Sequence, residues 1–313
     1  MKKQAFTYII TILIIAIIVI AISFLVKNQK NNLMIIKNLD DKIQASASSE
    51  SMINIAIADE NFKDNLKDLY FDKEANINPK FLDEVPGQDK KYILQVDNSI
   101  EKNGFKLKAY LKYKNNESAH EAYGTIANQI YTKGIPMLNK NVIDEEDYKE
   151  TLDSFNNFDT SGSNNVSFLK LDGKDYHLGR DGNSFIIYEI EEKIDGEYIE
   201  EIKNIVKKGD IYKSLYIKQR NGSLTVDDDM KLIGIVDIDN IILNQDLKVQ
   251  GIYLHRNEIL SENSSVKVDG IAINMNESSE NNIDATYNFK NIYVYAKLID
   301  NFIKSKIYSI QAS

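Results

Sequence analysis

Hydrophobic positions along this chain follow three different patterns, and the first is a continuous apolar run. Residues 5–26 carry no charge, and lysines flank the run on both sides. As a helix, these 22 residues span roughly 33 Å, which is enough for a hydrocarbon layer of ~30 Å. The pattern therefore predicts a transmembrane helix over 5–26.

A cleaved secretory signal is the competing interpretation of this run. The apolar part of such a signal is usually ~7 to 15 residues long and ends in small residues at the cleavage site. Here Phe24, Leu25 and Val26 stand at that place, so we predict a retained anchor. The lysines and the free amine before the run place the N-terminus in the cytoplasm and everything after Lys27 outside the membrane.

The second pattern is a helical spacing of apolar residues that continues beyond the anchor. Neither glycine nor proline occurs before Pro79, and apolar residues recur at helical intervals from Leu33 to Leu69. One interpretation is a nearly continuous helix of roughly 100 Å that ends near Leu69. The other is a separate amphipathic helix that folds back onto the body after a break at SASSES (46–51). In both cases residues 1–72 form an anchor and extended helix.

Residues 73–215 mix strand and helix patterns, which predicts an α+β region outside the membrane. YILQVDNS (92–99) and FKLKAYLKY (105–113) alternate apolar and polar residues around EKNG, as a hairpin does. The segments SFLKL, DYHLG and SFIIYEI, separated by DGK and RDGN, predict a meander with glycine-containing turns. SGSNN (161–165) predicts a loop.

Two segments of this region have helical spacing. SAHEAYGTIANQIY (118–131) predicts a helix that Gly134 and Pro136 end, and residues 196–208 predict a second helix.

The third pattern is G-I-x-x-x-x-N, which occurs as GIVDIDN, GIYLHRN and GIAINMN. Its period of 17 to 19 residues fits one coil of a β-solenoid with three short strands, and an ordinary antiparallel sheet is the alternative. We predict a short solenoid over 216–276. Glycine permits a bend between strands, and asparagine tolerates the left-handed backbone of a corner. The corner residues would be Gly234, Asn240, Gly251, Asn257, Gly270 and Asn276.

The repeat also predicts which side chains stack inside the solenoid. Residues 277–313 then read as a short amphipathic helix and a final strand, a helical cap that would cover the open edge of the solenoid. The inward stacks would be Leu232, Val249 and Val268, and Ile235, Ile252 and Ile271.

The amino-acid composition excludes several kinds of site and partner. A chain of 313 residues with 43% hydrophobic content can build sizeable cores. Cysteine is absent, so disulfides, thiolate metal sites and cysteine nucleophiles are excluded, and stability outside a cell must come from packing. The net charge of -9 argues against nucleic acid and anionic lipid as partners of the soluble part.

Motifs that could carry catalysis are weak. His120, His177 and His255 lie far apart without the spacing of metal ligands, and no serine stands in G-x-S-x-G. Acids between Asp227 and Asp239 suggest a surface polysaccharide hydrolase, which needs two acids along a groove with sugar-stacking aromatics. Three coils make a short groove and tryptophan is absent. We therefore predict no catalytic residue, metal, cofactor or small-molecule substrate.

The first residues resemble the start of type IV pilin-like proteins. In that family a short basic leader ends at glycine, phenylalanine follows, and a long apolar helix begins. KKQAFTYIITILII places two lysines in the leader and Phe6 at the first mature position. Two positions depart from the family, since Ala5 replaces the glycine and Ile10 replaces the glutamate of major pilins. The resemblance implies a prepilin-type processing junction between Ala5 and Phe6, and an assembly face that includes Phe6 and Ile10.

A second segment is similar to the PilX-type branch of pilus-assembly and minor pseudopilin proteins. SESMINIAI (49–57) is similar to the A-E-x-G-x-x-x-A segment of that branch, with Glu50 matching and Met52 replacing the glycine. Short β-coils followed by a tyrosine-rich helix and a last strand resemble clostridial members of the group. In this branch the missing acid at Ile10 suits a tip or initiating subunit.

The resemblance implies a non-enzymatic, single-pass envelope protein of a Gram-positive bacterium that assembles with other pilin-like or envelope subunits, with incorporation in a pilus. The alternative is a permanently anchored scaffold or binding module that polymerises through a bactofilin-like solenoid.

Overall fold

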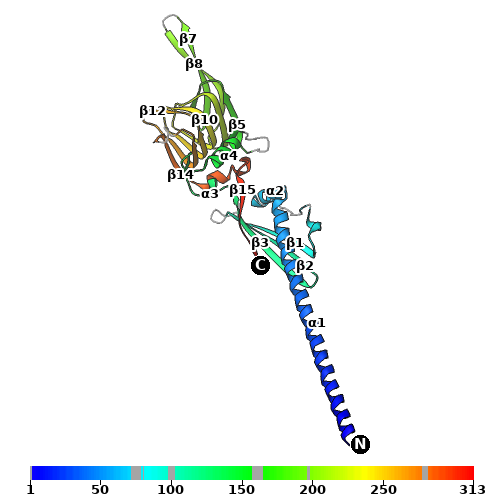
Figure 1. Ribbon diagram of the computed structural model, residues 1–313. Coiled ribbons are helices and arrows are strands. Elements are labelled where there is room, and N and C mark those ends of the chain that lie inside the picture. The colour runs from blue at the N-terminus through cyan, green and yellow to red at the C-terminus, as the bar shows by residue number, and fades with distance from the viewer. Residues whose placement is uncertain are drawn as a thin grey trace.

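A computed structural model describes residues 2–71, 79, 81–97, 103–156, 165–195, 198–276 and 281–313, with side chains from Tyr8 onward except at 97 and in 194–200. A long helix projects from the body, a four-stranded sheet covers its upper end, and a β-solenoid continues away from it (Figure 1). Most of the predicted loop 161–165 lies outside the described residues.

The first helix, α1 (Lys2–Ala58), is unbroken through SASSES. Its 57 residues make it about 85 Å long. It ends at Ala58 rather than near Leu69, because Oδ1 of Asp59 accepts a hydrogen bond from the Asn61 N–H at 2.9 Å and turns the chain. The chain then enters the short helix α2 (Phe62–Tyr70).

The sheet beside α1 is antiparallel, with the order β1-β2-β3-β15. The pairing of β1 with β2 confirms the predicted hairpin, whose turn, residues 98–102, lies outside the described residues. The strands are β1 (Gln88–Asp97), β2 (Gly104–Tyr113), β3 (Asn116–Ala127) and β15 (Ile303–Ala312).

The predicted helix over 118–131 is wrong, because most of that segment forms β3. Only α3 (Gln129–Thr132) is helical. β3 receives hydrogen bonds from β2 and β15 on its two sides, which outweighs local spacing. A Cβ at Gly124 would lie 2.4 Å from the Phe105 ring and 2.6 Å from the Lys306 carbonyl oxygen, so the strand packing requires glycine there.

The predicted helix over 196–208 is also wrong. The described part of this segment lies in β8 (Tyr198–Asp210), which pairs antiparallel with β7 (Ser184–Asp195) along its length. The pairing partner provided by β7 decides the conformation, although the glutamates and lysines of the segment are acceptable in a helix. Together β7 and β8 form a ribbon that projects from the far end of the body (Figure 1).

The repeat forms a parallel β-solenoid of about four turns, which confirms that prediction and excludes the antiparallel alternative. Each full coil runs through a first, a second and a third face; in β10 these are residues 230–233, 234–238 and 240–243. The strands are β9 (Ser214–Val226), β10 (Met230–Leu243), β11 (Leu247–His255), β12 (Ile259–Ser261), β13 (Val266–Asn274) and β14 (Ile283–Tyr287).

The solenoid begins earlier than the repeat indicated. β5 (Ser167–Asp172) and β6 (Tyr176–Asp181) both pair in parallel with β9, so the first coil starts at Ser167 and not near residue 216. Of the three strands of the predicted meander, only β6 and β7 pair antiparallel with each other, and β8 continues this antiparallel pairing in place of β5. Short alternating segments do not reveal from their own residues whether their partner runs parallel or antiparallel.

One of the two predicted inward stacks is correct. Leu232, Val249 and Val268 pack inside the solenoid. Ile235, Ile252 and Ile271 are aligned with one another but face outward into a second core, because side-chain alternation continues through the preceding glycine. This second core contains residues of α1, α2, the sheet and the C-terminal segment, among them Met52, Leu66, Leu107, Phe289, Ile292, Tyr295 and Phe302.

The C-terminal segment departs from its predicted place. α5 (Phe289–Tyr293) lies beside β11 and β13, and the 3-10 helix η3 (Ala296–Leu298) follows it. The final strand β15 pairs with β3 and not with the solenoid, so it does not cover the open edge of the solenoid as the predicted cap would. The remaining elements are η1 (Leu82–Glu84), β4 (Met137–Leu138), which pairs with β13, and α4 (Glu145–Asn156).

Polar side chains also lie inside the solenoid. Gln219, His255 and Asn274 occupy equivalent positions of β9, β11 and β13, with Ile238 at that position of β10, and the three polar residues are at most 1% exposed. Nε2 of His255 has no hydrogen-bond partner among the described residues. Burial lowers the pKa of the His255 imidazole to about 4, so the ring is neutral in the folded protein at neutral pH.

The corner glycines supply a first prediction. Gly251 has φ +143°, and a Cβ there would lie 2.1 Å from the Gly234 carbonyl oxygen. Gly173 has φ +72° but no heavy atom within 4 Å of its Cβ position. Gly173→Ala should cost about 1 kcal/mol of folding stability, and Gly251→Ala about 3 kcal/mol or more, because the coils must also separate. Urea unfolding of the full chain in detergent measures both; equal losses would contradict the stacking.

The buried histidine supplies a second prediction. The unfolded chain protonates His255 below about pH 6.5, whereas the folded protein protonates it only near the lowered pKa of about 4. The unfolded state holds more protons between these values, so stability falls as pH drops through this window, by about 3 kcal/mol in total. In urea titrations from about pH 7 to pH 4, His255→Gln should remove this part of the acid sensitivity. An equally steep loss in that variant would refute the assignment.

Candidate functional site

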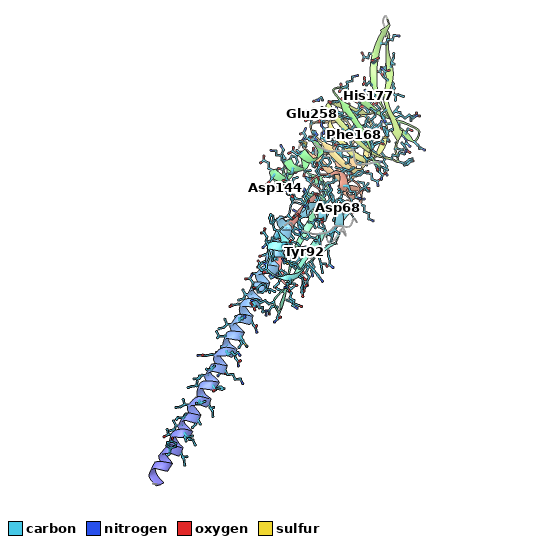
Figure 2. All side chains as sticks on the ribbon, turned by 90° about the vertical axis from the view of Figure 1, so that its right-hand side faces the viewer. Asp68, Tyr92, Asp144, Phe168, His177 and Glu258 are labelled. Atoms are coloured by element: carbon cyan, nitrogen blue, oxygen red, sulfur yellow. The ribbon has the colours of Figure 1, made fainter. Side chains whose placement is uncertain are left out.

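The upper end of α1 is fastened to the body. Met52, Ile53 and Ala56 are fully buried, and the Tyr92 hydroxyl donates a hydrogen bond to the Met52 carbonyl at 2.8 Å. Toward the N-terminus, the helix extends beyond the body and stands alone (Figure 2). Earlier along the same face, Ala45, Ser48 and Ser49 are buried; their small side chains allow close approach of the helix to the sheet.

A serine and a histidine meet at this junction. Oγ of Ser49 lies 2.6 Å from Nδ1 of His120 and 2.9 Å from Oγ of Ser118. Such a pair can serve as nucleophile and base in an open site. Here Ser49 is 0% and His120 7% exposed, and both lie between helix and sheet. The contact therefore stabilises the packing of α1 on β3.

The lower part of α1 is free of the body. Within the described ranges, α1 is the one helix long and apolar enough to cross a membrane, a property that membrane anchors and signal sequences share. Ala5 and Phe6 lie in its first turns, but their side chains are outside the described set, and Ile10 is exposed on its surface. Residues 27–44, the stalk, extend for about 27 Å beyond the predicted membrane segment.

The stalk carries an exposed apolar stripe. It is separated from the docked face of α1 by roughly 150° around the helix at 100° per residue, so it points away from the sheet. Asp41, which forms an ion pair with Lys114, marks where the body begins. The stalk stripe consists of Leu33 (67% exposed), Ile36 (55%), Leu39 (56%) and Ile43 (59%).

The predicted corner residues lie at two different corners of the solenoid. The glycines stand between the first and second faces, aligned in register, with φ between +143° and +154°. The asparagines follow the second face and do not have left-handed backbones, in contrast to the expectation; the left-handed residue there is Asn221. Asn240 instead donates through its amide to the Gly222 carbonyl at 3.0 Å, and Asn276 donates to the Asn257 carbonyl.

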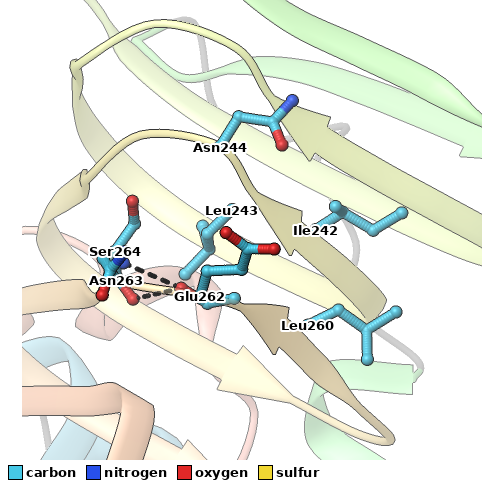
Figure 3. Close-up of a pocket in the computed structure, with 8 residues that line it drawn as sticks. Ile242, Leu243, Asn244, Leu260, Glu262, Asn263 and Ser264 are labelled. Carbon is cyan, nitrogen blue, oxygen red and sulfur yellow. Dashed lines mark hydrogen bonds between the residues drawn. The ribbon is translucent and has the colours of Figure 1, made fainter.

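A groove lies on the third face (Figure 3). Oγ of Ser261 donates to the Ser264 carbonyl at 2.6 Å and shapes one wall. Glu262 is the one charged side chain among the residues that line this groove. A pair of carboxylates, which glycoside hydrolysis requires, is not present among them. The lining residues are Ile242, Leu243, Asn244, Leu260, Ser261, Glu262, Asn263 and Ser264.

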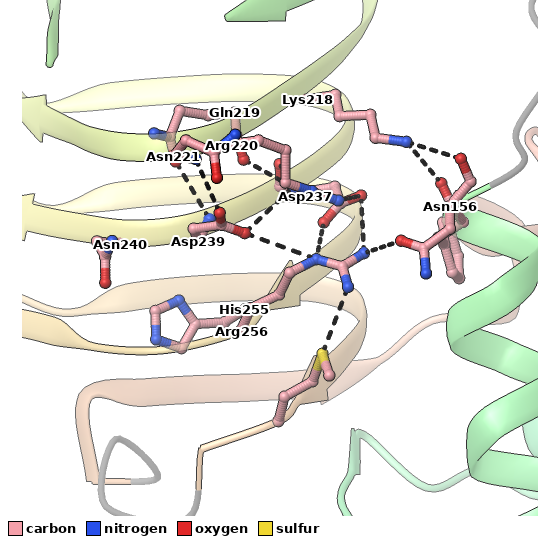
Figure 4. Close-up of polar contacts among 12 residues, drawn as sticks. Asn156, Lys218, Gln219, Arg220, Asn221, Asp237, Asp239, Asn240, His255 and Arg256 are labelled. Carbon is pink, nitrogen blue, oxygen red and sulfur yellow. Dashed lines mark hydrogen bonds and ion pairs between the residues drawn. The ribbon is translucent and has the colours of Figure 1, made fainter. Parts of the chain in front are cut away.

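An ion-pair network lies on the outer side of the second face (Figure 4). Asp237 is fully buried; its Oδ1 accepts from Nε of Arg256 at 3.1 Å, and its Oδ2 accepts from Nη2 of Arg220. Asp239 lies 3.6 Å from Nη1 of Arg220. Two of the acids that suggested hydrolysis, Asp237 and Asp239, are thus held by arginines. The sequence signal for this network was the repeat itself, which aligns Asp239 with Arg256 one coil later.

The same network holds the end of α4 against the solenoid. Nη2 of Arg256 donates to Oδ1 of Asn156 at 3.1 Å, and Nζ of Lys218 donates to the Phe155 and Asn156 carbonyls at 3.2 and 2.9 Å. A cation at the last carbonyls of a helix satisfies orphan acceptors and opposes the helix dipole. Burial lowers the pKa of Lys218.

The third histidine of the chain, His177 in β6, lies at the base of the β7–β8 ribbon. Nδ1 of His177 is 2.8 Å from Oδ2 of Asp227, which also accepts from the Tyr188 hydroxyl at 2.6 Å. Asn244 donates to the other oxygen of Asp227 at 2.9 Å. Among the described residues no three His, Asp or Glu side chains are arranged to hold a metal ion.

The small docked residues of α1 supply a third prediction. Ala45→Leu should push the helix from the sheet and cost about 1–3 kcal/mol, because the buried position has no room. Ala47→Leu is the matched control, since Ala47 is exposed two residues later and should change stability by less than about 0.5 kcal/mol. Urea unfolding and limited proteolysis at α1 measure the difference. Equal effects would show that close approach is not required.

Comparison with protein-family models, with curated proteins and with solved structures finds no match to this chain.

Proposed function

We propose that this chain is a single-pass envelope protein that acts by helix-mediated assembly, as type IV pilus-assembly or minor pseudopilin subunits do. The observation that supports this proposal is that one part of α1 packs on the body and the other part is exposed. Residues 45–58 dock on a four-stranded antiparallel sheet, while residues 8–40 are exposed. A helix held rigidly at one end and exposed at the other is suited to packing among equivalent helices.

In this proposal, residues 5–26 cross the membrane of a Gram-positive cell with the N-terminus in the cytoplasm. The stalk then holds the body about 27 Å above the membrane surface. Neighbouring subunits approach through their helices, first within the membrane and then within a pilus. Van der Waals packing between helices supplies the association in the apolar layer.

The stalk stripe supports association outside the membrane as well. Large apolar side chains in water are unfavourable, and each contributes ~1.5–3 kcal/mol when a partner buries it fully. Leu33, Ile36, Leu39 and Ile43 are more than half exposed and point away from the body. A contiguous patch of this kind marks an interaction surface.

The second candidate is a permanently anchored scaffold that polymerises through its solenoid. The outer edge of β14 favours it, because the described part of the chain contains no strand that pairs there. An open parallel edge can accept another coil. In that case the N-terminus remains uncleaved, which separates this candidate from pilin-type processing.

Photo-crosslinking in the native envelope tests the assembly proposal. With benzoylphenylalanine in place of Ile36, we expect adducts to the helices of neighbouring envelope proteins, several-fold above those from the same replacement at Asn38. Asn38 is exposed on the opposite side of the stalk and is therefore the matched control. Equal or absent protein adducts would rule out the stripe as an assembly surface.

Mass spectrometry of the same preparations reads the mature N-terminus. A chain that begins at Phe6 supports prepilin-type processing. A chain that retains Met1 contradicts that processing and favours the anchored scaffold.

A further inference from the structure

The exposed part of α1 carries an uncharged seam that repeats every seven residues (Figure 2). With Ile36 at position a of the heptad abcdefg, the seam consists of positions a and d between residues 22 and 43. The lysines and aspartates of this stretch, from Lys27 to Lys42, fall at positions b, e, f and g. Of the seven possible heptad frames, this is the one in which both seam positions are uncharged, so the sequence defines a single seam.

The apolar residues of the seam have the order that favours two parallel strands. Isoleucine occupies a and leucine occupies d in the heptads that begin at Ile22 and Ile36. This order favours a parallel two-stranded coiled coil, in which each seam side chain fits a hole between four residues of the facing helix. Such packing would cover side chains that are each more than half exposed in the single chain. They are Ile22, Leu25, Ile36, Leu39 and Ile43.

Two amide side chains interrupt the apolar seam directly beyond the proposed membrane segment. Gln29 is at position a and Asn32 at position d, and both are exposed. An amide side chain donates and accepts hydrogen bonds, so it can pair with an identical residue at the same height. An unrelated apolar helix would leave both amides buried and unpaired, which is unfavourable. Because polar seam residues fix register and strand number, these amides favour a second copy of this chain as the partner.

The body leaves the seam accessible. Ile36 and Ala45, which is buried in the docked part of α1, lie roughly 180° apart around the helix at 100° per residue. Farther along the seam side, Ala47 and Asn54 are exposed. Two helices can therefore meet along the seam while each body lies on the outer side of the pair. The seam ends before Glu50, which occupies the next a position.

The residues beside the seam are compatible with such a pair. In a parallel coiled coil, each g side chain lies near the e side chain of the next heptad of its partner. Like charges do not meet at these positions, and the lysines at b and f stay in water. The g and e pairs would be Asn28 with Leu33, Ile35 with Asp40, and Lys42 with Ala47.

We propose that two copies of this chain pair through residues 22–43 of α1 as a parallel, in-register, two-stranded coiled coil. This inference rests on the proposed helix-mediated assembly and names its partner. Insertion into the membrane by the same end gives the two helices the same direction and places equivalent residues at the same height. Removal of Ile36, Leu39 and Ile43 from water drives the contact, and the two amides set its register.

Disulfide trapping tests the partner and the register. The chain has no cysteine, so Leu39→Cys introduces one thiol at position d. Asn38→Cys is the matched control, because it introduces one thiol at position c, on the side of the stalk that faces away from the seam. In native envelopes that contain two differently tagged copies, oxidation should link both tags several-fold more in Leu39→Cys than in Asn38→Cys. Equal linkage of the two variants, or none, overturns the proposal.

The same trap separates this inference from the proposed function. Benzoylphenylalanine at Ile36 could form adducts to other envelope proteins while Leu39→Cys forms no dimer. That result would retain helix-mediated assembly and refute a second copy as the partner. Loss of both signals would refute both.

A charged substitution tests the seam. In the Leu39→Cys background, Ile36→Lys should lower dimer formation by at least about five-fold, because it brings two ammonium groups together. Asn38→Lys adds the same charge at position c and should leave dimer formation unchanged. Urea unfolding of the body should be equal in both variants, since both positions are exposed on the stalk. Equal loss of dimers in both variants would show that the seam is not the contact.

Native mass spectrometry of the full chain in detergent counts the strands. We expect two chains in each particle. Particles of three or more chains, or single chains alone, would contradict the two-stranded arrangement.

Discussion

The second face of the solenoid is buried on both of its sides, and this double burial joins the parts of the molecule. Val236 and Ile238 face the solenoid interior, whereas Ile235, on the same strand, faces the layer formed by the C-terminal segment. A sheet that is buried on both sides needs packing partners on both of its faces. Here the segments before and after the repeat in sequence pack on the outer side of the second face. The outer core is continuous from Met52 of α1 to Ile271 of β13, so helix, sheet and solenoid form one body.

The buried polar groups join neighbouring parts of this continuous body. The Asp237 network holds the end of α4 on the covered face, and the Ser49–His120 contact holds α1 on the sheet. Both arrangements contain residue types that catalyse reactions in the open sites of other proteins. Here these residues are buried, and their contacts stabilise the packing of one element on another. The exposed features lie at the two ends of the molecule. The stalk stripe is on one side of the body and the β7–β8 ribbon on the other (Figure 1).

The local sequence pattern was sufficient to predict the conformation of a segment where one kind of interaction dominates that segment. The apolar helix and the glycine repeat were predictable because each has a strong period. The helices predicted over 118–131 and 196–208 failed because partners distant in sequence decide those conformations; β3 pairs with β15, which is more than 170 residues later. The Asp237 network was also missed, because its arginines come from neighbouring coils.

The sequence by itself determined the apolar N-terminal helix and the solenoid coils with their glycine corners, because each rests on contacts within a segment or between adjacent repeats. Only the tertiary structure decided that SASSES continues the helix, since its small residues matter through their approach to the sheet. It also decided that Ile235 and its equivalents face outward, because their side chains are covered by α5 and the C-terminal turn. Both outcomes depend on surfaces that distant segments bring together, and no local period records them.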